Sequence, residues 1–382
     1  MTDLSRITCI DDLRQLARRR VPRMFYDYVC AGSWSESTCR ANTADFDSLL
    51  LRQRVAVDLQ NRSTAARMIG QHVAMPIALA PTGLAGMQWA DGEILAARAA
   101  RDFGVPFTLS TMSVCSIEDV AREAGPGFWF QLYLMRDRDF IERLIERARQ
   151  AGCTALVLTL DLQILGQRHK DIKNGLSTPP KPTLANLLNL ATKPRWCWHM
   201  LHTRRRQLGN LIGHVKGVSD MGNLAAWTAE QFDPRLDWND VEWVKRRWGG
   251  KLILKGILDA RDARLAAQTG ADALIVSNHG GRQLDGAPSS IRALPAIVEA
   301  VGPQIEVHLD GGIHSGQNAL KAWALGARGL YIGRPFLWGL GAAGQAGVTR
   351  ALQILQKELD LTMAFCGHKR LQDVTPDIFF RP

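Results

Sequence analysis

Eight short apolar runs between residues 76 and 333 constrain the fold of this chain more than any other sequence feature. Each run is almost continuously apolar and ends in a polar or glycine-containing turn. Strands of this kind are buried on both faces, as in a parallel sheet that is covered by helices. The runs span residues 76–81, 105–110, 128–133, 155–161, 251–255, 273–278, 305–310 and 328–333.

Segments with helical periodicity separate the runs. Residues 137–152 read D-R-D-F-I-E-R-L-I-E-R-A-R-Q-A-G, with acids early, bases late and a closing glycine, which is typical of a helix. Eight such β/α units predict a (β/α)8 TIM barrel. A doubly wound sheet is the alternative, but it usually has fewer strands and a glycine-rich first turn, which the turn after residues 76–81 lacks.

The spacing of the runs predicts one domain with additions. The gap between Asp161 and Lys251 is far longer than the others and indicates an insertion after the fourth strand. We therefore interpret the whole chain, 1–382, as a single domain. Its expected parts are an N-terminal helical segment (1–75), the barrel (76–348), the insertion (174–232, a possible membrane contact or lid) and C-terminal helices (349–382).

The positive charge is concentrated in the insertion. The formal net charge is +10, and eight Lys or Arg residues without any Asp or Glu lie between Ile172 and Ser219. A uniformly basic nucleic-acid-binding protein would carry its positive charge along the whole chain. The distribution instead predicts one basic segment on a nearly neutral body.

The cysteine spacing and the N-terminal sequence restrict the cellular compartment in which the protein is expected. The seven cysteines include no C-x-x-C pair, which argues against a zinc site or a disulfide framework and fits a reducing environment. The first 25 residues carry charges throughout and lack a signal-peptide core. No apolar stretch is long enough to span a bilayer. We expect a cytoplasmic protein without a bound metal.

Polar side chains follow the predicted strands where a barrel enzyme carries its catalytic groups. Lys255, His279 and Asp310 end three neighbouring strands, so their side chains should converge. A histidine can act as a general base near neutral pH, and a carboxylate beside it can fix its tautomer. Arg168 and Arg282 could hold a substrate carboxylate by charge-assisted hydrogen bonds. Each residue alone could also belong to an ordinary polar turn.

The last two strand ends predict a phosphate site. Their loops read D-G-G-I-H-S-G (310–316) and I-G-R-P (332–335), and the loops after strands seven and eight of such barrels commonly bind phosphate. A single phosphate site favours a mononucleotide. The motif G-L-G-A-A-G (339–344) matches a dinucleotide fingerprint but does not open a first β/α unit, so we interpret it as a small-residue helix face.

With these motifs assembled, the chain resembles the FMN-dependent L-2-hydroxy acid dehydrogenase and oxidase family. The resemblance extends from Y-D-Y-V-C-A-G (26–32) to I-G-R-P, and S-N-H-G-G-R-Q-L-D-G (277–286) is its most specific part. Within the family, L-R-Q-R (51–54) and Q-F-D-P (231–234) are most similar to bacterial quinone-linked L-lactate dehydrogenases.

The resemblance implies a role for each matching position. His279 would take the hydroxyl proton as hydride leaves for flavin N5, Asp310 would hold His279, Tyr133 would lie near the hydroxyl, and Lys255 would stabilise the reduced flavin. The implied substrate-binding residues are Tyr28, Met112, Arg168 and Arg282. The implied FMN-binding residues are Pro81, Thr82, Gly83, Ser110, Gln131, Thr159, Lys255, Ser277, Asp310, Gly312, His314, Gly333 and Arg334.

Two departures from the family pattern affect these expectations. His314 stands where relatives usually have arginine, so we predict weaker retention of FMN, increasingly so as pH rises. Leu162 and Gln163 replace the usual residues after the fourth strand and, with Met112, should reshape the pocket wall. The identity of the hydroxy acid is therefore open.

The resemblance implies oxidation of L-lactate to pyruvate, with electrons passed to quinone by a homotetramer. Alternatives are an oxidase that uses O2, a glycolate or mandelate-type enzyme, and a lipid- or nucleic-acid-binding barrel without turnover. The insertion combines L-L-N-L (187–190), Trp196, Trp198 and three consecutive arginines (204–206). This composition suits peripheral contact with the inner face of the cell membrane, or a solvated lid.

Overall fold

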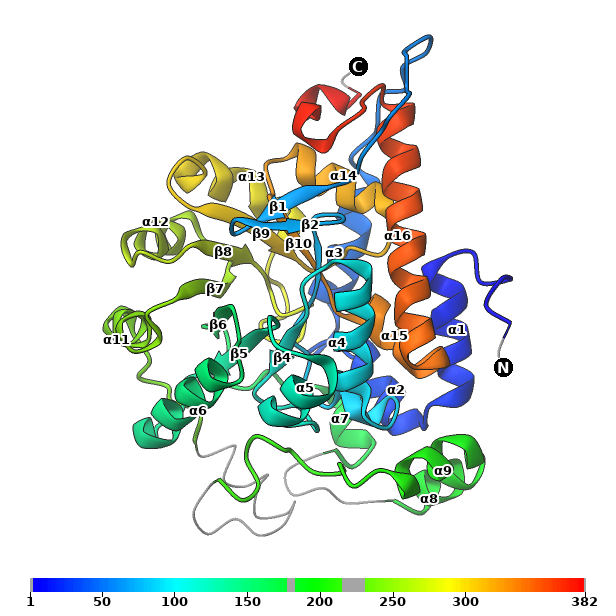
Figure 1. Cartoon of the computed structure of the whole chain (residues 1–382), viewed down its shortest axis with the longest axis vertical. Helices are drawn as coiled ribbons and strands as arrows, with labels where there is room; N and C mark the ends of the chain where they lie inside the picture. The colour runs from blue at the N-terminus through cyan, green and yellow to red at the C-terminus, as the bar shows by residue number, and fades with distance from the viewer. Residues whose placement is uncertain (1–2, 177–182, 215–230, 381–382) are drawn as a thin grey trace.

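A computed structural model describes residues 3–176, 183–214 and 231–380. Its main sheet is parallel and has the strand order β3-β10-β9-β8-β7-β6-β5-β4, and a parallel bridge between Leu79 and Phe107 brings the two edges together. This confirms the predicted (β/α)8 barrel (Figure 1). The strands are β3 (Ile77–Leu79), β4 (Thr108–Ser110), β5 (Trp129–Tyr133), β6 (Ala155–Thr159), β7 (Lys251–Ile257), β8 (Ala273–Val276), β9 (Glu306–Asp310) and β10 (Gly329–Ile332).

Helices cover the outside of the barrel, which explains why the strands are buried on both faces. Within residues 137–152, α6 begins after Asp137, whose carboxylate accepts a hydrogen bond from the backbone N–H of Phe140 and caps the helix. The covering helices are α4 (Gly92–Phe103), α5 (Ile117–Ala124), α6 (Arg138–Gln150), α11 (Trp238–Trp248), α12 (Ala260–Gln268), α13 (Ser290–Val301), α14 (Gly316–Ala324), α15 (Arg334–Ala343) and α16 (Gln345–Phe365).

The N-terminal segment is helical only in part. After α1 (Ile10–Arg20), α2 (Arg23–Cys30) and α3 (Ser37–Asp47), the chain forms a hairpin of β1 (Ala66–Met68) and β2 (Gln71–Val73). The hairpin buries Met68 and Val73. Its turn is held by a hydrogen bond from the backbone N–H of Ile69 to the carboxylate of Glu306, the first residue of β9. The expectation of helix up to residue 75 is therefore wrong at its end, because the hairpin covers the N-terminal ends of the barrel strands.

The G-L-G-A-A-G motif lies in α15 and the turn to α16, as predicted for a small-residue helix face. A Cβ added to Gly339 would lie 2.5 Å from the backbone oxygen of Gly347. The two helices therefore pack closely only because both positions are glycine.

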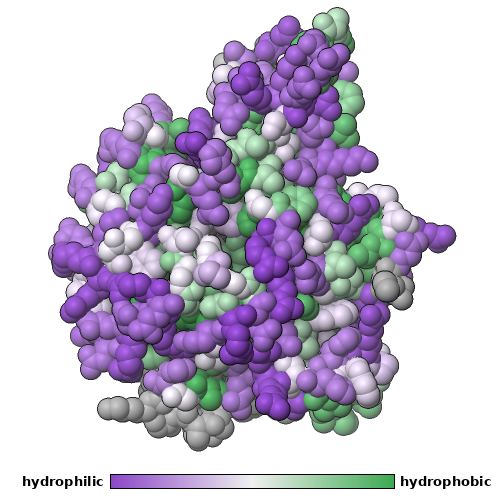
Figure 2. Space-filling view, viewed as in Figure 1, coloured by the Kyte–Doolittle hydropathy of each residue, from purple (hydrophilic) through white to green (hydrophobic). Residues whose placement is uncertain are grey.

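After α7 (His169–Lys173), the described part of the insertion contains α8 (Leu184–Ala191) and α9 (Pro194–His202). Figure 1 places α8 and α9 at one corner of the molecule, beside the ends of α1 and α2. The exposed apolar side chains on α8 and α9 are Leu184, Leu187, Leu188, Trp198 and Leu201. Figure 2 shows hydrophobic residues at this corner. Among the helices that the structure describes, none is long and apolar enough to cross a membrane.

Candidate active site

A cavity of about 370 Å³ opens at the C-terminal ends of the barrel strands. Most of the residues predicted from the sequence line it: Tyr28, Pro81, Thr82, Gly83, Met112, Tyr133, Arg168, Lys255, His279, Arg282, Asp310, Gly312, His314, Gly333 and Arg334. The remaining predicted residues, Ser110, Gln131, Thr159 and Ser277, are buried at or next to the same strand ends. The fold thus brings the predicted set together at one end of the barrel.

The floor of the cavity contains a buried ionic cluster. Lys255 Nζ lies 3.0 Å from Asp310 Oδ2 and donates a hydrogen bond of 2.9 Å to Ser277 Oγ. Ser277 in turn donates to Asp310 Oδ2 at 2.8 Å. Burial alone would lower the pKa of Lys255, but the carboxylates of Asp310 and Asp161 outweigh it and raise that pKa. The ammonium group therefore stays charged beneath the cavity.

A second buried chain of hydrogen bonds crosses three strand ends. Ser110 Oγ donates to Gln131 Oε1 at 3.0 Å, and Gln131 Nε2 donates to Thr159 Oγ1 at 3.0 Å. Ser110 Oγ also accepts from the backbone N–H of Met112. These contacts fix the orientation of the Gln131 amide, so this side of the site presents a defined pattern of donors and acceptors.

His279 is held by Asp161. His279 Nδ1 lies 2.9 Å from Asp161 Oδ1, whereas Asp310 contacts Lys255 and Ser277. The expectation that Asp310 holds the histidine is therefore wrong. The physical reason is a β-bulge in β7, where Gly256 has φ +107° and a Cβ would lie 2.7 Å from the side chain of Asp161. The glycine leaves room for Asp161 to reach His279.

The loop that carries His279 has an unusual backbone. His279, Gly280 and Gly281 have φ values of 58°, 66° and 73°. A histidine in the left-handed region is strained, and strain of this kind clusters at functional sites because the surrounding structure must hold it. The backbone N–H of His279 donates to Ser277 Oγ, which ties the loop to the ionic cluster.

Burial and charge prepare the histidine to act as a base. Burial lowers the pKa of His279 and the nearby Lys255 charge adds to this, while Asp161 opposes both. Burial opposes ionisation of Asp161, but His279 and Lys255 hold the pKa of that carboxyl below its ordinary value. At neutral pH the imidazole is therefore neutral beside a charged carboxylate, as a general base requires.

Two arginines face the cavity around a buried acid that the sequence analysis missed. Arg168 Nη1 and Arg282 Nη2 lie 3.6 Å and 4.0 Å from Asp171 Oδ2. Arg282 also donates to the carbonyls of Tyr28 and Ala31. Burial and the charge of Arg168 lower the pKa of Arg282 to about 10. Arg282 therefore remains charged at neutral pH, and one carboxylate does not balance two guanidinium groups, so an anionic ligand would be stabilised here.

The opposite end of the cavity is formed by the loops after β9 and β10. Arg334 begins α15 and donates to the carbonyls of Val29, Ala31 and Gly280. A Cβ on Gly333 would make only ordinary contacts, with Thr82 and Ala80 at 3.7 and 3.9 Å, so the space above it is open. A helix N-terminus, an arginine and an open glycine form a donor set suited to phosphate.

His314 lies at this end with its ring 5.3 Å from that of Trp338. Burial, together with the charges of Arg334 and Arg14, lowers its pKa to about 4. His314 is therefore already neutral at pH 6. We therefore expect FMN retention to vary little with pH through His314, in place of the increasing loss with pH that the sequence suggested.

We expect His314→Arg to slow the release of FMN about tenfold or more, because a charge-assisted hydrogen bond replaces a neutral one. The measurement is FMN fluorescence after dilution of both proteins, at several pH values between 6 and 9. The difference should be nearly constant over this range. Equal release rates, or a wild-type rate that climbs steeply with pH, would contradict the assignment.

The outer wall of the cavity is apolar and comes partly from the insertion. Its side chains include Leu162, Leu165, Leu176, Leu208 and Phe232. Gln163, which we expected in this wall, instead donates to the carbonyl of Leu236 at 2.7 Å. Sequence spacing gave no signal for Leu176, Leu208 or Phe232, because their approach depends on how the insertion folds back.

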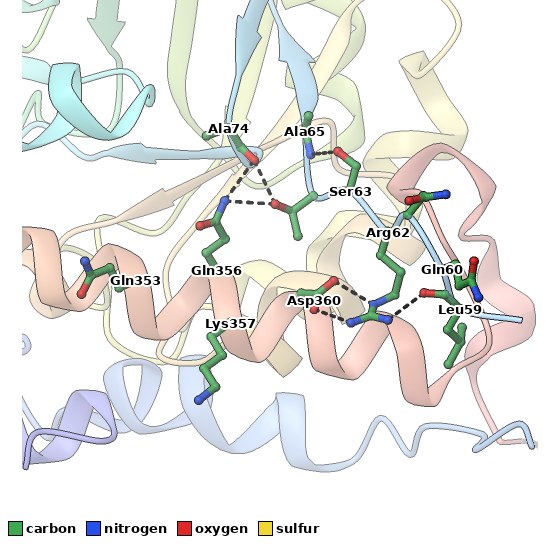
Figure 3. Close-up of a pocket in the computed structure, with 12 residues that line it drawn as sticks. Leu59, Gln60, Arg62, Ser63, Ala65, Ala74, Gln353, Gln356, Lys357 and Asp360 are labelled. Carbon is green, nitrogen blue, oxygen red and sulfur yellow. Dashed lines mark hydrogen bonds and ion pairs between the residues drawn. The ribbon is translucent and has the colours of Figure 1, made fainter. Parts of the chain in front are cut away.

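A wider groove of about 1170 Å³ lies elsewhere, between residues 59–65 and α16 (Figure 3). Arg62 and Asp360 form a two-pronged ion pair across it, and Gln356 donates to Thr64. None of the predicted site residues lines this groove. Its side chains join α16 to the N-terminal segment, and we assign it a structural role.

Comparison with known proteins gives consistent results. A family model described as FMN-dependent dehydrogenase matches residues 17–381. L-lactate dehydrogenase of Caulobacter vibrioides is 43% identical over 375 residues, which is 97% of each chain, and that of Ectopseudomonas mendocina is 41% identical over 98% of this chain and 99% of its own. The crystal structure of the monotopic membrane protein (S)-mandelate dehydrogenase is 35% identical, with a TM-score of 0.93 over 99% of this chain and 100% of that chain.

Proposed function

This chain belongs to the FMN-dependent dehydrogenase family, and from that premise we propose that it oxidises L-lactate to pyruvate. The observation that carries the proposal is the His279–Asp161 pair in the same cavity as Arg168 and Arg282. A base and a carboxylate-binding pair are the two features that oxidation of a 2-hydroxy acid requires from the protein.

The cavity residues fit FMN. Gly312, His314, Gly333 and Arg334 would hold the phosphate at one end. The residues that would line the ring system and ribityl chain are Pro81, Thr82, Gly83, Ser110, Gln131, Thr159 and Ser277. When bound, FMN supplies the acceptor for the hydride of the substrate. The cation of Lys255 would stabilise the negative charge that this transfer creates.

The substrate would lie between the arginine pair, Arg168 and Arg282, and the base, His279. Arg168 and Arg282, with Tyr28, would bind its carboxylate, and Arg168 Nε is buried without a hydrogen-bond partner among the described residues. His279 would accept the hydroxyl proton, and Asp161 would stabilise the resulting imidazolium. Burial and the charge of Asp161 raise the pKa of Tyr133, so its phenol stays protonated and can donate to the substrate hydroxyl.

The test is anaerobic mixing of the yellow holoenzyme with a panel of compounds, followed by loss of flavin absorbance. We expect L-lactate to bleach the protein quickly. D-lactate should fail because its hydrogen points away from the acceptor, and L-lactamide because it has no carboxylate for the arginines. Equal bleaching by L-lactamide, or no bleaching by any L-2-hydroxy acid, would contradict the proposal.

A mandelate-type substrate is the second candidate. The apolar wall around Met112, Leu162 and Phe232 could pack against a phenyl ring. Structural neighbours that include (S)-mandelate dehydrogenase and mandelate oxidase, the latter 36% identical with a TM-score of 0.82, support this alternative. Faster bleaching by (S)-mandelate than by L-lactate in the same panel would favour it.

For the electron acceptor we propose a quinone, and for the location peripheral contact with the inner face of the cell membrane. The exposed apolar residues of α8 and α9 and the monotopic relative support this contact. Reoxidation of the bleached protein by a quinone, but only slowly by O2, would separate a dehydrogenase from an oxidase. The family resemblance also leads us to propose a homotetramer.

A further inference from the structure

A second, smaller cavity of about 200 Å³ lies where α1 and α9 meet, outside the active site. Four cations line it: Arg19, Arg20, Lys193 and Arg195. No Asp or Glu lines it, and none of the four forms an ion pair with a carboxylate in residues 3–176, 183–214 or 231–380. We call this cavity the basic pocket.

The cations of the basic pocket are positioned but not neutralised. Lys193 Nζ donates to the carbonyl of Arg19 at 2.6 Å, and Arg20 donates to the carbonyl of Ala342. The guanidinium carbon of Arg195 lies 5.5 Å from the centre of the Trp89 ring. Carbonyl oxygens and aromatic rings carry no net charge, so the mutual repulsion remains. Burial and the charge of Arg195 together lower the pKa of Arg20, in agreement with that repulsion.

The basic pocket lies at the base of the apolar corner. On α9, the side chains of Arg195, Trp196 and His199 line the pocket, while Trp198 and Leu201 on another side are 63% and 67% exposed. Trp196 is anchored by a hydrogen bond of 2.9 Å from Nε1 to the carbonyl of Met87. Tryptophan and basic side chains beside an apolar surface are typical of the water–lipid interface.

We propose that the basic pocket binds the phosphate of an anionic phospholipid headgroup while the apolar side chains of α8 and α9 enter the bilayer. The cations supply charge-assisted donors for phosphate oxygens, and the start of α9 adds the positive end of its helix dipole. The volume suits a phosphate with part of its glycerol. The inference rests on the membrane contact proposed above, and it adds a preference for one headgroup chemistry.

The test is flotation of the FMN-loaded protein with vesicles of phosphatidylcholine alone and with vesicles that also contain phosphatidylglycerol. The pocket variant is Lys193→Gln/Arg195→Gln. The control is Arg204→Gln/Arg206→Gln, which removes the same charge from the same insertion outside the pocket. We expect the pocket variant to lose at least tenfold more binding to the anionic vesicles than the control. Arg195→Lys, which keeps the charge, should retain most of it.

Each other outcome is informative. Equal losses in the two double variants would overturn the pocket in favour of diffuse attraction. In that case each basic residue near the surface raises the membrane affinity about fivefold, wherever it lies. Equal wild-type binding to both vesicle types would overturn the pocket but keep the apolar contact, and binding to neither would overturn both. Binding of inorganic phosphate at low millimolar concentration that leaves binding to the anionic vesicles unchanged would identify a free-anion site instead. Bleaching by L-lactate should be unchanged in both variants, which checks folding and reports on catalysis separately.

Discussion

Replacing His279 with asparagine is expected to slow anaerobic bleaching by L-lactate about 10³- to 10⁴-fold, because the proton of the hydroxyl loses its acceptor. Asparagine is the appropriate substitute because it tolerates the left-handed backbone at this position, where φ is 58°. The measurement is the rate of flavin bleaching in a stopped-flow experiment at saturating L-lactate.

The control for His279→Asn is the amount of FMN that the variant binds. The variant should remain yellow with the FMN content of the wild type, because Arg334, Lys255 and Gly312 at the other positions of the cavity are unchanged. A rate within tenfold of the wild type would exclude His279 as the base and would direct attention to Tyr133.

Asp161→Asn is expected to lower kcat/KM about a hundredfold to a thousandfold and to move the acid limb of its pH profile downward. Asp161 raises the pKa of His279 against the effect of burial, so its removal lowers that pKa further. The base is active when deprotonated, so the wild-type limb should lie below pH 6.5 and the variant limb lower still. The plateau falls because the imidazolium formed during the reaction loses its counter-ion.

Asp310→Asn is the matched control, since Asp310 contacts Lys255 and Ser277 but not His279. It should lower the rate, because Lys255 loses the carboxylate that positions it and keeps it charged, but it should not move the acid limb downward. If Asp310→Asn shifted the limb and Asp161→Asn did not, the pairing of His279 with Asp161 would be wrong.

The strands and most of the site could be predicted from sequence because their signals are local. Because each strand is buried on both faces, it appears in the sequence as an apolar run. Polar residues that follow parallel strands must lie together at one end of the barrel. Lys255, His279 and Asp310 follow from this rule, as does α6 from its charge pattern and cap. The hairpin of residues 66–73 was not predicted because its strands are partly exposed and therefore do not form apolar runs in the sequence.

Sequence alone was enough to predict the barrel, the family resemblance and the set of residues at the strand ends. The tertiary structure decided which of them touch. Asp161 reaches His279 because the bulge at Gly256 shifts the register of β7, and Asp171 reaches Arg282 because the long segment after β6 packs against the loop after β8. Register shifts and the return of a long loop depend on packing between distant segments. A local sequence pattern therefore carries no signal for them.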